Sequence, residues 1–165
     1  MTDKITTGLV IGKFAPMHKG HQFLLESALA RVDRLIVLVY DVPFLTKVPI
    51  EVRMGWIRKL YPQAEIINAG VGPKETGDSS EVNKLHIDYA KGRLPAGAKI
   101  DFIFSSEDYG RFLADALGAE NILVDRDRTN VPIYAGTIRK DLGAYRNYVE
   151  DFVCEDLIKY EDRKI

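Results

Sequence analysis

The strongest constraint on the fold is a series of short apolar runs in which hydrophobic residues follow one another without alternation. The runs are GLVIG at 8–12, RLIVLVY at 34–40, AEIINAG at 64–70, IDFIFSS at 100–106 and NILVD at 121–125. Continuous apolarity of this kind is typical of strands that are buried on both faces of a parallel sheet. The runs therefore predict a sheet of about five parallel strands.

The segments between these runs carry the spacing of amphipathic helices. After the first run, Phe23, Leu24, Ala28 and Val32 recur at helical intervals with polar residues between them, which predicts a helix over 21–32. Further helices are predicted at 50–61, near 80–91, and at 107–118, 136–142 and 144–160. Strands that alternate with helices predict an α/β fold with a doubly wound parallel sheet.

Composition limits the class of protein and its partners. The chain has 165 residues, 46% of them hydrophobic, and a net charge of −1, which predicts a single domain over 1–165 and no nucleic-acid partner. The one cysteine, Cys154, cannot form an internal disulfide and is expected to be buried in a protein of a reducing compartment. No signal core or membrane-spanning run is seen, so we expect a cytoplasmic protein with no membrane partner.

The stretch GKFAPMHKGH at 12–21 is the most unusual part of the chain, because it holds two of the three histidines. His18 and His21 are three residues apart, a spacing that on a helical turn places both imidazoles on one face. In open α/β sheets, ligands bind where strand carboxyl ends meet helix amino ends. Polar clusters occupy four such positions, at 12–21, 41–53, 105–109 and 125–139. We expect them to line one crevice.

Several chemistries could use a histidine pair in a glycine-rich turn. A metal site lacks an evident third ligand, and nucleophilic catalysis lacks a serine or cysteine in an activating motif. The dinucleotide and P-loop fingerprints are absent, and a purely structural pair fits an exposed turn poorly. The remaining chemistry for the pair is hydrogen-bond donation from the imidazoles to a phosphate group. Nucleotidyl transfer to a phosphate acceptor needs positioned donors rather than a protein base, because the acceptor is already an anionic nucleophile.

Two motifs give the chain a family resemblance. GKFAPMHKGH resembles the G-x-F-x-P-x-H-x-G-H signature of the HxGH nucleotidyltransferases, and AGTIRKD at 135–141 resembles their late S-x-T-x-[RK] element, with Ala135 in place of serine. The resemblance covers nearly the whole chain and is closest to the nicotinamide mononucleotide (NMN) adenylyltransferase domain of NadR-type proteins. It implies a Rossmann-like fold, transfer of AMP from ATP to NMN with release of pyrophosphate, and Mg²⁺ carried by the substrate phosphates.

The resemblance also implies roles for individual residues. His18, His21, Lys13 and Arg139 would act on the reacting phosphates, with Arg139 on the departing pyrophosphate. Nucleotide contacts are implied for Gly12, Phe14, Gly20, Asp125, Arg128, Gly136, Thr137 and Ile138, and acceptor contacts for Asp41 and Arg53.

Some of these residues, and other notable residues of the chain, have a plainer structural explanation. Arg53 could be solvated on its helix, and Asp125 could pair with Arg128. Trp56 is expected in the core, and His86 at the surface or hydrogen-bonded. Ser106, Glu107 and Tyr109 lie at a strand–helix junction, where the sequence Ser-Ser-Glu is expected to cap a helix and contact with nucleotide is the less favoured alternative.

The acceptor and the final activity stay open at this point. Relatives carry tryptophans in the segment equivalent to 72–92, and this chain has none there. The same chemistry could therefore serve nicotinate mononucleotide, phosphopantetheine, FMN, or glycerol phosphate with CTP. A nucleotide sensor without turnover is a further alternative, because Ala135 removes one hydroxyl donor. The resemblance implies that self-association is common.

Overall fold

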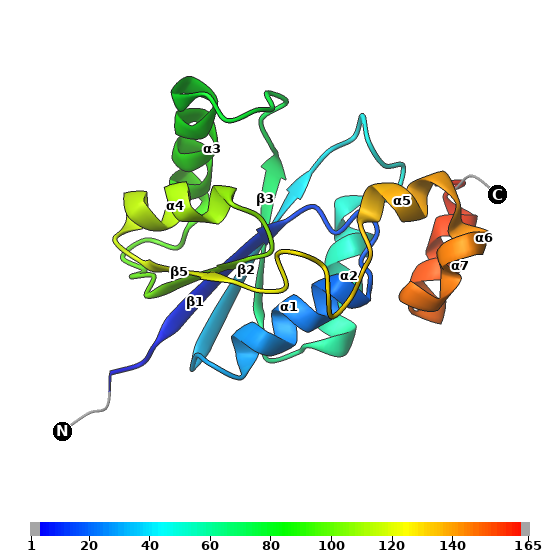
Figure 1. Cartoon of the computed structure of the whole chain (residues 1–165), viewed down its shortest axis with the longest axis horizontal. Coiled ribbons are helices and arrows are strands. Elements are labelled where there is room, and N and C mark those ends of the chain that lie inside the picture. The colour runs from blue at the N-terminus through cyan, green and yellow to red at the C-terminus, as the bar shows by residue number, and fades with distance from the viewer. Residues whose placement is uncertain (1–3, 163–165) are drawn as a thin grey trace.

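The computed structural model describes residues 4–162 and contains one five-stranded sheet in which every neighbouring pair is parallel (Figure 1). The strands are β1 (Thr7–Gly12), β2 (Arg34–Asp41), β3 (Glu65–Val71), β4 (Phe102–Ser105) and β5 (Glu120–Leu123). Their order in the sheet is β3-β2-β1-β4-β5. The predicted parallel sheet is confirmed, and its winding reverses between β1 and β4, where such sheets bind ligands.

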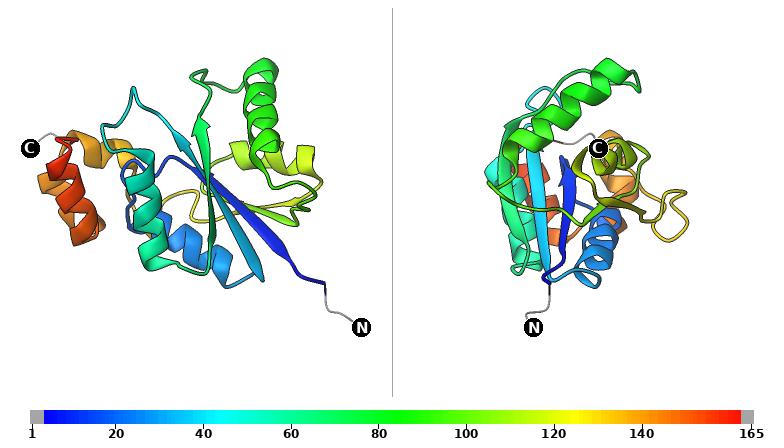
Figure 2. Two further views of the ribbon diagram at one scale, coloured as in Figure 1. Left: turned by 180° about the vertical axis from the view of Figure 1, so that it is seen from behind. Right: turned by 90° about the vertical axis from the view of Figure 1, so that its left-hand side faces the viewer.

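Helices cover both faces of the sheet (Figure 2). They are α1 (Lys19–Leu29), α2 (Ile50–Leu60), α3 (Ser80–Arg93), α4 (Tyr109–Leu117), α5 (Ala135–Lys140), α6 (Leu142–Tyr145) and α7 (Asp151–Lys159), with a 3₁₀ turn at Arg146–Tyr148. Side chains of α1, α2 and α5–α7 share one core with Val10 and Val37, whereas those of α3 and α4 share a second core with Leu9 and Ile36. Successive residues along a strand therefore pack into opposite cores, which explains why the runs are apolar throughout.

The C-terminal region differs from the expected pair of helices. The predicted helix over 136–142 stops at Lys140, because Asp141 is extended and its carboxylate accepts a hydrogen bond from the Ala144 amide at 3.0 Å. The helix predicted over 144–160 is divided, since Val149 is extended and buried in the core. A helical period alone does not reveal such breaks, because each depends on a partner outside the helix.

Two further expectations concern buried residues. Trp56 is in the core, and its indole N–H donates to Asp156 at 2.7 Å, which attaches α7 to α2. Cys154 is buried as expected.

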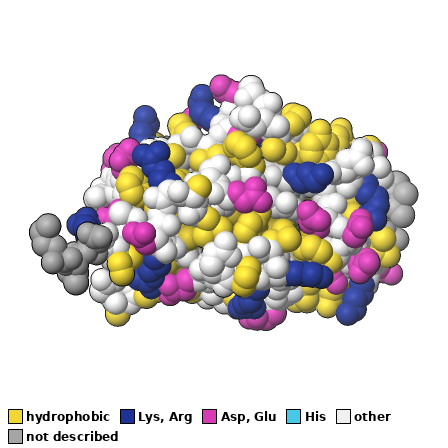
Figure 3. Space-filling model, turned by 90° about the horizontal axis from the view of Figure 1, so that it is seen from below, with side chains coloured by type: hydrophobic (Ala, Val, Ile, Leu, Met, Phe, Trp, Pro, Cys, Tyr) yellow, Lys and Arg dark blue, Asp and Glu magenta, His cyan; other side chains and the backbone are white. Residues whose placement is uncertain are grey.

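Across residues 4–162, no helix has the length and apolarity needed to cross a membrane. Basic and acidic side chains are interspersed on the face shown in Figure 3, in keeping with the small net charge.

Candidate active site

A cleft of about 270 Å³ opens at the carboxyl ends of β1 and β4; we call it the first cleft. Its polar lining residues are Lys13, His18, His21, Tyr40, Ser105, Ser106, Glu107, Tyr109, Arg128, Tyr134 and Arg139. The predicted clusters at 12–21, 105–109 and 125–139 thus meet around one space, and the cluster at 41–53 contributes only Leu45.

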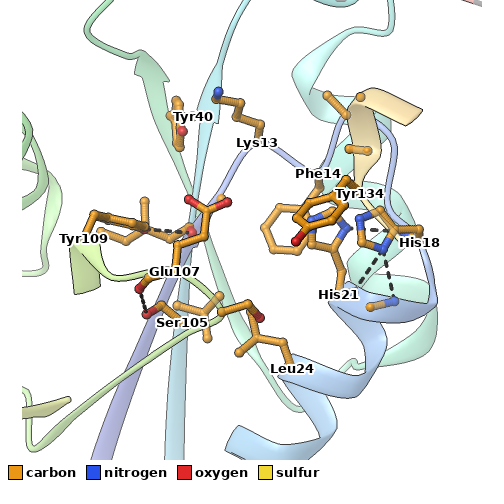
Figure 4. Close-up of a pocket in the computed structure, with 18 of the residues that line it drawn as sticks. Lys13, Phe14, His18, His21, Leu24, Tyr40, Ser105, Glu107, Tyr109 and Tyr134 are labelled. Carbon is orange, nitrogen blue, oxygen red and sulfur yellow. Dashed lines mark hydrogen bonds between the residues drawn. The ribbon is translucent and has the colours of Figure 1, made fainter. Parts of the chain in front are cut away.

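The two histidines of the signature loop (residues 12–21) hold each other in a reciprocal cap (Figure 4). His18 precedes α1 with an extended backbone, and its Nδ1 accepts hydrogen bonds from the amides of Gly20 at 3.0 Å and His21 at 3.4 Å. His21 Nδ1 accepts in return from the His18 amide at 3.2 Å, and the two rings stack with centroids 3.8 Å apart. The pair therefore shares one face, but His18 is the cap of the helix and not part of its first turn.

This cap sets the protonation state of both imidazoles. Because each Nδ1 accepts a hydrogen bond, the proton of each neutral ring is on Nε2, which is left to donate. Burial, reinforced by the charge of Arg128, lowers the pKa of His18 to about 3. Burial and the neighbouring His18 hold the pKa of His21 well below its ordinary value. Both rings are thus neutral Nε2–H donors at neutral pH.

We expect these histidines to make the fold sensitive to acid. In the unfolded chain His18 has its ordinary pKa of 6.5. Below that pH the unfolded state therefore binds a proton that the folded state does not bind. The free energy of unfolding should therefore fall as the pH is lowered through this window. His18→Asn retains a capping oxygen and removes the titration, so it should reduce the fall between about pH 7 and pH 5 by about 1–2 kcal/mol. Urea denaturation of both proteins at the two pH values checks this. The prediction is refuted if the free energy of unfolding falls by the same amount in both proteins.

Glycine is required at Gly20 by the cap itself. A Cβ at Gly20 would lie 2.8 Å from His18 Cε1 and 2.9 Å from its Nδ1, so any side chain there displaces the capping ring. At Gly12, a Cβ would lie 2.9 Å from the ring of Phe14, which is buried beside His21 with ring centroids 4.7 Å apart. Both glycines act by allowing close approach of these rings, in keeping with the positions that the motif assigns to them.

A pair of alanine substitutions should separate this steric role from helix propensity. At Gly55 in α2, a Cβ would meet no atom within 4 Å, so Gly55→Ala should stabilise the protein by about 0.5–1 kcal/mol. Gly20→Ala gains the same propensity but breaks the cap, and should destabilise by about 1 kcal/mol. Chemical denaturation measures both values. A stabilising Gly20→Ala would contradict the role of the cap.

The late motif (residues 135–141) reaches the signature loop directly. The Arg139 guanidinium donates to the carbonyl of Ala15, and Gly136 and Arg139 line the first cleft together with the histidines. Burial lowers the pKa of Arg139 from its usual value. Segments from opposite ends of the chain thus form one wall of cations and N–H donors.

The late motif offers different donors from those expected. The amides of Thr137 and Ile138 already donate to the Tyr134 carbonyl, at 3.1 and 3.3 Å, and neither residue lines the cleft. Ile138 is instead a core residue. Ala135 and Gly136 line the cleft at the start of α5, where backbone amides have no partner within the helix.

Asp125 organises the loop after β5. With a positive φ of 51°, its carboxylate accepts hydrogen bonds from the amides of Asn130 and Val131, both at 2.9 Å. These bonds, that from Asn130 first, lower the pKa of Asp125 to about 2. Asp125 is not part of the cleft lining, so the structure gives it the role of shaping the loop.

Arg128 lies inside the cleft. Its guanidinium carbon is 4.5 Å from the centroid of the Tyr134 ring, and its Nε is buried with no hydrogen-bond partner within residues 4–162. No ion pair joins Arg128 to Asp125 in this part of the chain. The cation is therefore held on an aromatic face with a donor to spare.

The structure does not bring Arg53 to a cleft surface. The side chain is 0% exposed, and it donates to the carbonyls of Lys13 at 2.5 Å and Val48 at 3.2 Å and pairs with Asp41 at 2.5 Å. Neither Asp41 nor Arg53 lines the first cleft or the cleft beside it. This corrects the expectation of a solvated or acceptor-facing arginine: the guanidinium supports the signature loop from within the fold.

A second cleft, also of about 270 Å³, adjoins the first on the side of α3 and α4. Lys13 is exposed between the two clefts, with its Nζ 5.9 Å from the centroid of the Tyr40 ring. His86 lines the second cleft and its Nε2 lies 2.9 Å from the Glu75 carbonyl, so it is the hydrogen-bonded histidine expected.

Sequence reasoning placed the clusters at 105–109 and 125–139 at the crevice but did not identify all the side chains that line it. Ser106, Glu107 and Tyr109 line the first cleft, and Asp108, at the cap of α4, makes no side-chain cap, so the expected helix-capping role is wrong. Tyr134 was not singled out. Its place directly before the late motif was the available signal. No group of three His, Cys, Asp or Glu side chains within residues 4–162 is arranged to hold a metal ion.

Comparison with known proteins is consistent with this geometry. No protein-family model matches the chain. The trifunctional NAD biosynthesis/regulator protein NadR of Escherichia coli (strain K12) is 27% identical over an alignment 169 positions long, which covers 88% of this chain and 39% of that protein. NadR of Salmonella typhimurium (strain LT2) is 28% identical over 161 residues, or 86% of this chain and 38% of that protein. The chain is similar to NadR over most of its length. The resemblance predicted from its two motifs is confirmed, and the chain spans about two fifths of these relatives.

Solved structures share the fold. A crystal structure of NadR in complex with NAD and AMP-PNP matches 93% of this chain and 47% of that chain, with a TM-score of 0.64 and 15% identity. A bifunctional NMN adenylyltransferase/ADP ribose pyrophosphatase from Francisella tularensis matches 96% of this chain and 52% of that chain, with a TM-score of 0.59 and 17% identity. The architecture is therefore the Rossmann-like nucleotidyltransferase fold.

Proposed function

We propose that this chain is a single nucleotidyltransferase domain that transfers AMP from ATP to the phosphate of NMN, forming NAD and pyrophosphate. The observation that carries the proposal is the meeting of the two motifs: His18 and His21 line the same cleft as Gly136 and Arg139, and Arg139 donates to the signature loop. Homology to NadR and the fold shared with an NMN adenylyltransferase support the same reaction class.

The cleft can perform this reaction by positioning and charge alone. An oxygen of the acceptor phosphate attacks the α-phosphorus, the bond from that phosphorus to the bridging oxygen breaks, and pyrophosphate leaves with the electron pair. The Nε2–H groups of His18 and His21 would stabilise the charge on the α-phosphate, and Arg128 and Arg139 that on the departing pyrophosphate. Lys13, between the clefts, would draw the two anions together.

Mg²⁺ would enter bound to the ATP phosphates. The polar lining of the first cleft has a single carboxylate beside nitrogen donors, cations and hydroxyl groups, which fits a metal carried by the substrate better than one held by side chains. The metal would supply charge neutralisation for the leaving pyrophosphate. A Francisella tularensis relative in the same fold was crystallised with AMP and a Mn ion, which supports a divalent cation in the reaction.

The second cleft is our candidate for the acceptor. It adjoins the first along a shared wall and is lined by aromatic residues, among them Tyr40, Phe44, Tyr89 and Tyr109. These rings offer stacking surfaces, although only Tyr89 comes from the segment 72–92 that has no tryptophan. Nicotinate mononucleotide, phosphopantetheine, FMN, and glycerol phosphate with CTP remain the alternative acceptors, and a sensor without turnover remains the alternative function. We further propose a cytoplasmic setting, as expected from the sequence, and self-association, as the resemblance implies.

Pyrophosphate release tests the proposal. The chain is incubated with ATP, Mg²⁺ and each acceptor in turn, and we expect release with NMN well above that with the others. Release with a different acceptor would reassign the substrate but keep the reaction. Tight binding of ATP without release from any acceptor would support the sensor and overturn the proposed activity.

A further inference from the structure

The wall between the two clefts contains an unexpected anion. The residues that line both clefts are Ile11, Lys13, Tyr40, Glu107 and Tyr109. Glu107 is the one carboxylate in the described lining of the first cleft. A carboxylate repels the phosphates of both ligands, so its position here calls for a group that complements its charge. The ligands can supply such a group as Mg²⁺ on the ATP phosphates or as a positively charged ring, and the place of Glu107 on the wall of the second cleft favours the ring of the acceptor.

The side chain of Glu107 extends into the cleft and makes no contact that stabilises the described part of the fold. Its carboxylate has no hydrogen bond or ion pair to the described residues, and Figure 4 shows it extending into the cleft between the tyrosines and the histidine pair. The backbone around it is held in place. Ser105 Oγ donates to the Glu107 carbonyl at 2.8 Å, and Asp108 accepts two hydrogen bonds from Arg126, at 2.8 and 2.7 Å.

Tyrosine rings lie beside this carboxylate on the acceptor side. Tyr40 and Tyr109 line the shared wall with it, and Tyr40 meets Tyr89 edge to face with centroids 6.4 Å apart. One face of Tyr89 is already covered by the Arg93 guanidinium, 4.2 Å from the ring centroid. Burial, and then the charge of Glu107, raise the pKa of Tyr40, so its phenol is neutral at physiological pH. Tyrosine rings beside a carboxylate form an environment that favours a flat organic cation.

We infer that Glu107 is a specificity-determining residue that selects acceptors with a positively charged ring, such as the pyridinium of NMN, over acceptors of the same shape with an uncharged ring. This inference rests on the proposed function. It explains how a cleft without tryptophan recognises its acceptor: the tyrosines supply the aromatic faces, Glu107 the complementary charge, and Lys13 the contact to the acceptor phosphate.

The experiment compares NMN with its reduced form, in which the ring is a neutral dihydropyridine of nearly the same outline. Steady-state pyrophosphate release with saturating ATP gives KM for each acceptor. We expect the wild-type KM to be lower for the charged ring, and Glu107→Gln to raise the KM for NMN about fivefold and bring the ratio of the two KM values close to one. Glu120→Gln makes the same charge change on exposed β5, outside both clefts, and should preserve the ratio.

Calorimetric binding of both acceptors to wild type and Glu107→Gln, without ATP, gives the same ratio independently of turnover. A preference for NMN that survives in Glu107→Gln, in KM or in binding, overturns the inference and leaves the proposed transfer reaction intact. No pyrophosphate from wild type with either acceptor overturns the proposed function, and the calorimetric ratio then still decides the role of Glu107.

Discussion

Replacing His21 by asparagine is expected to lower kcat for pyrophosphate release by about 10²–10³-fold, with a melting temperature close to that of the wild type. Removal of one well-placed donor to a transition-state oxyanion typically has an effect of this size. Asparagine Oδ1 occupies nearly the place of the imidazole Nδ1, so the hydrogen bond from the His18 amide can be kept. The Nε2–H donor alone is lost.

His21→Gln is the complementary variant. Its amide N–H reaches about as far as Nε2, but it has no acceptor at the position of Nδ1, so activity should be retained better while the cap is weakened by about 1 kcal/mol. Steady-state kinetics and urea denaturation of both variants measure the two effects. Wild-type turnover in His21→Asn would refute the proposed contact with the α-phosphate.

Replacing Arg53 by methionine is expected to reduce the free energy of unfolding by about 3–5 kcal/mol. The buried guanidinium satisfies the Lys13 and Val48 carbonyls and pairs with Asp41, which is only 27% exposed. Methionine fills much of the volume but leaves the two carbonyls without this donor and the Asp41 carboxylate without its counter-charge, with only the hydrogen bond from the Val42 amide, at 2.9 Å, remaining to it. Activity should fall as well, because the base of the signature loop is released. Equilibrium denaturation in urea measures the loss of stability.

Arg58→Met in the same helix is the matched control. Arg58 is 52% exposed and lies 4.0 Å from Glu51, so its loss should change stability by less than about 0.5 kcal/mol. The outcome also separates two roles for Arg53. A higher KM for the acceptor with unchanged unfolding would restore the contact with acceptor that the sequence suggested. Destabilisation confirms the supporting role.

The architecture could be predicted well because its signals are local. Each strand is marked by its own apolar run and each long helix by its own period, and these patterns need no knowledge of the neighbours. Errors appear where a distant partner decides the local conformation. The break at Val149, for example, comes from burial of that side chain in a core shared with α1 and α2.

The candidate site was predicted in position and only partly in detail. The motifs placed His18, His21 and Arg139 correctly in one cleft, since parallel strands bring their carboxyl ends together. The direction in which each side chain points could not be predicted from the sequence. Arg53 faces inward and Glu107 faces the cleft, although both are charged residues of clusters that were expected to line one crevice.

By itself, the sequence determined the parallel sheet and the alternation of its strands with helices, because these follow from the period of the apolar residues. It also marked the two motifs that meet at the first cleft, through residue types at short spacing. The tertiary structure alone decided the neutral Nε2–H state of the histidines, the burial of Arg53 and the place of Glu107 between two clefts. Each of these depends on a hydrogen-bond partner or a degree of desolvation that is set only when the chain folds.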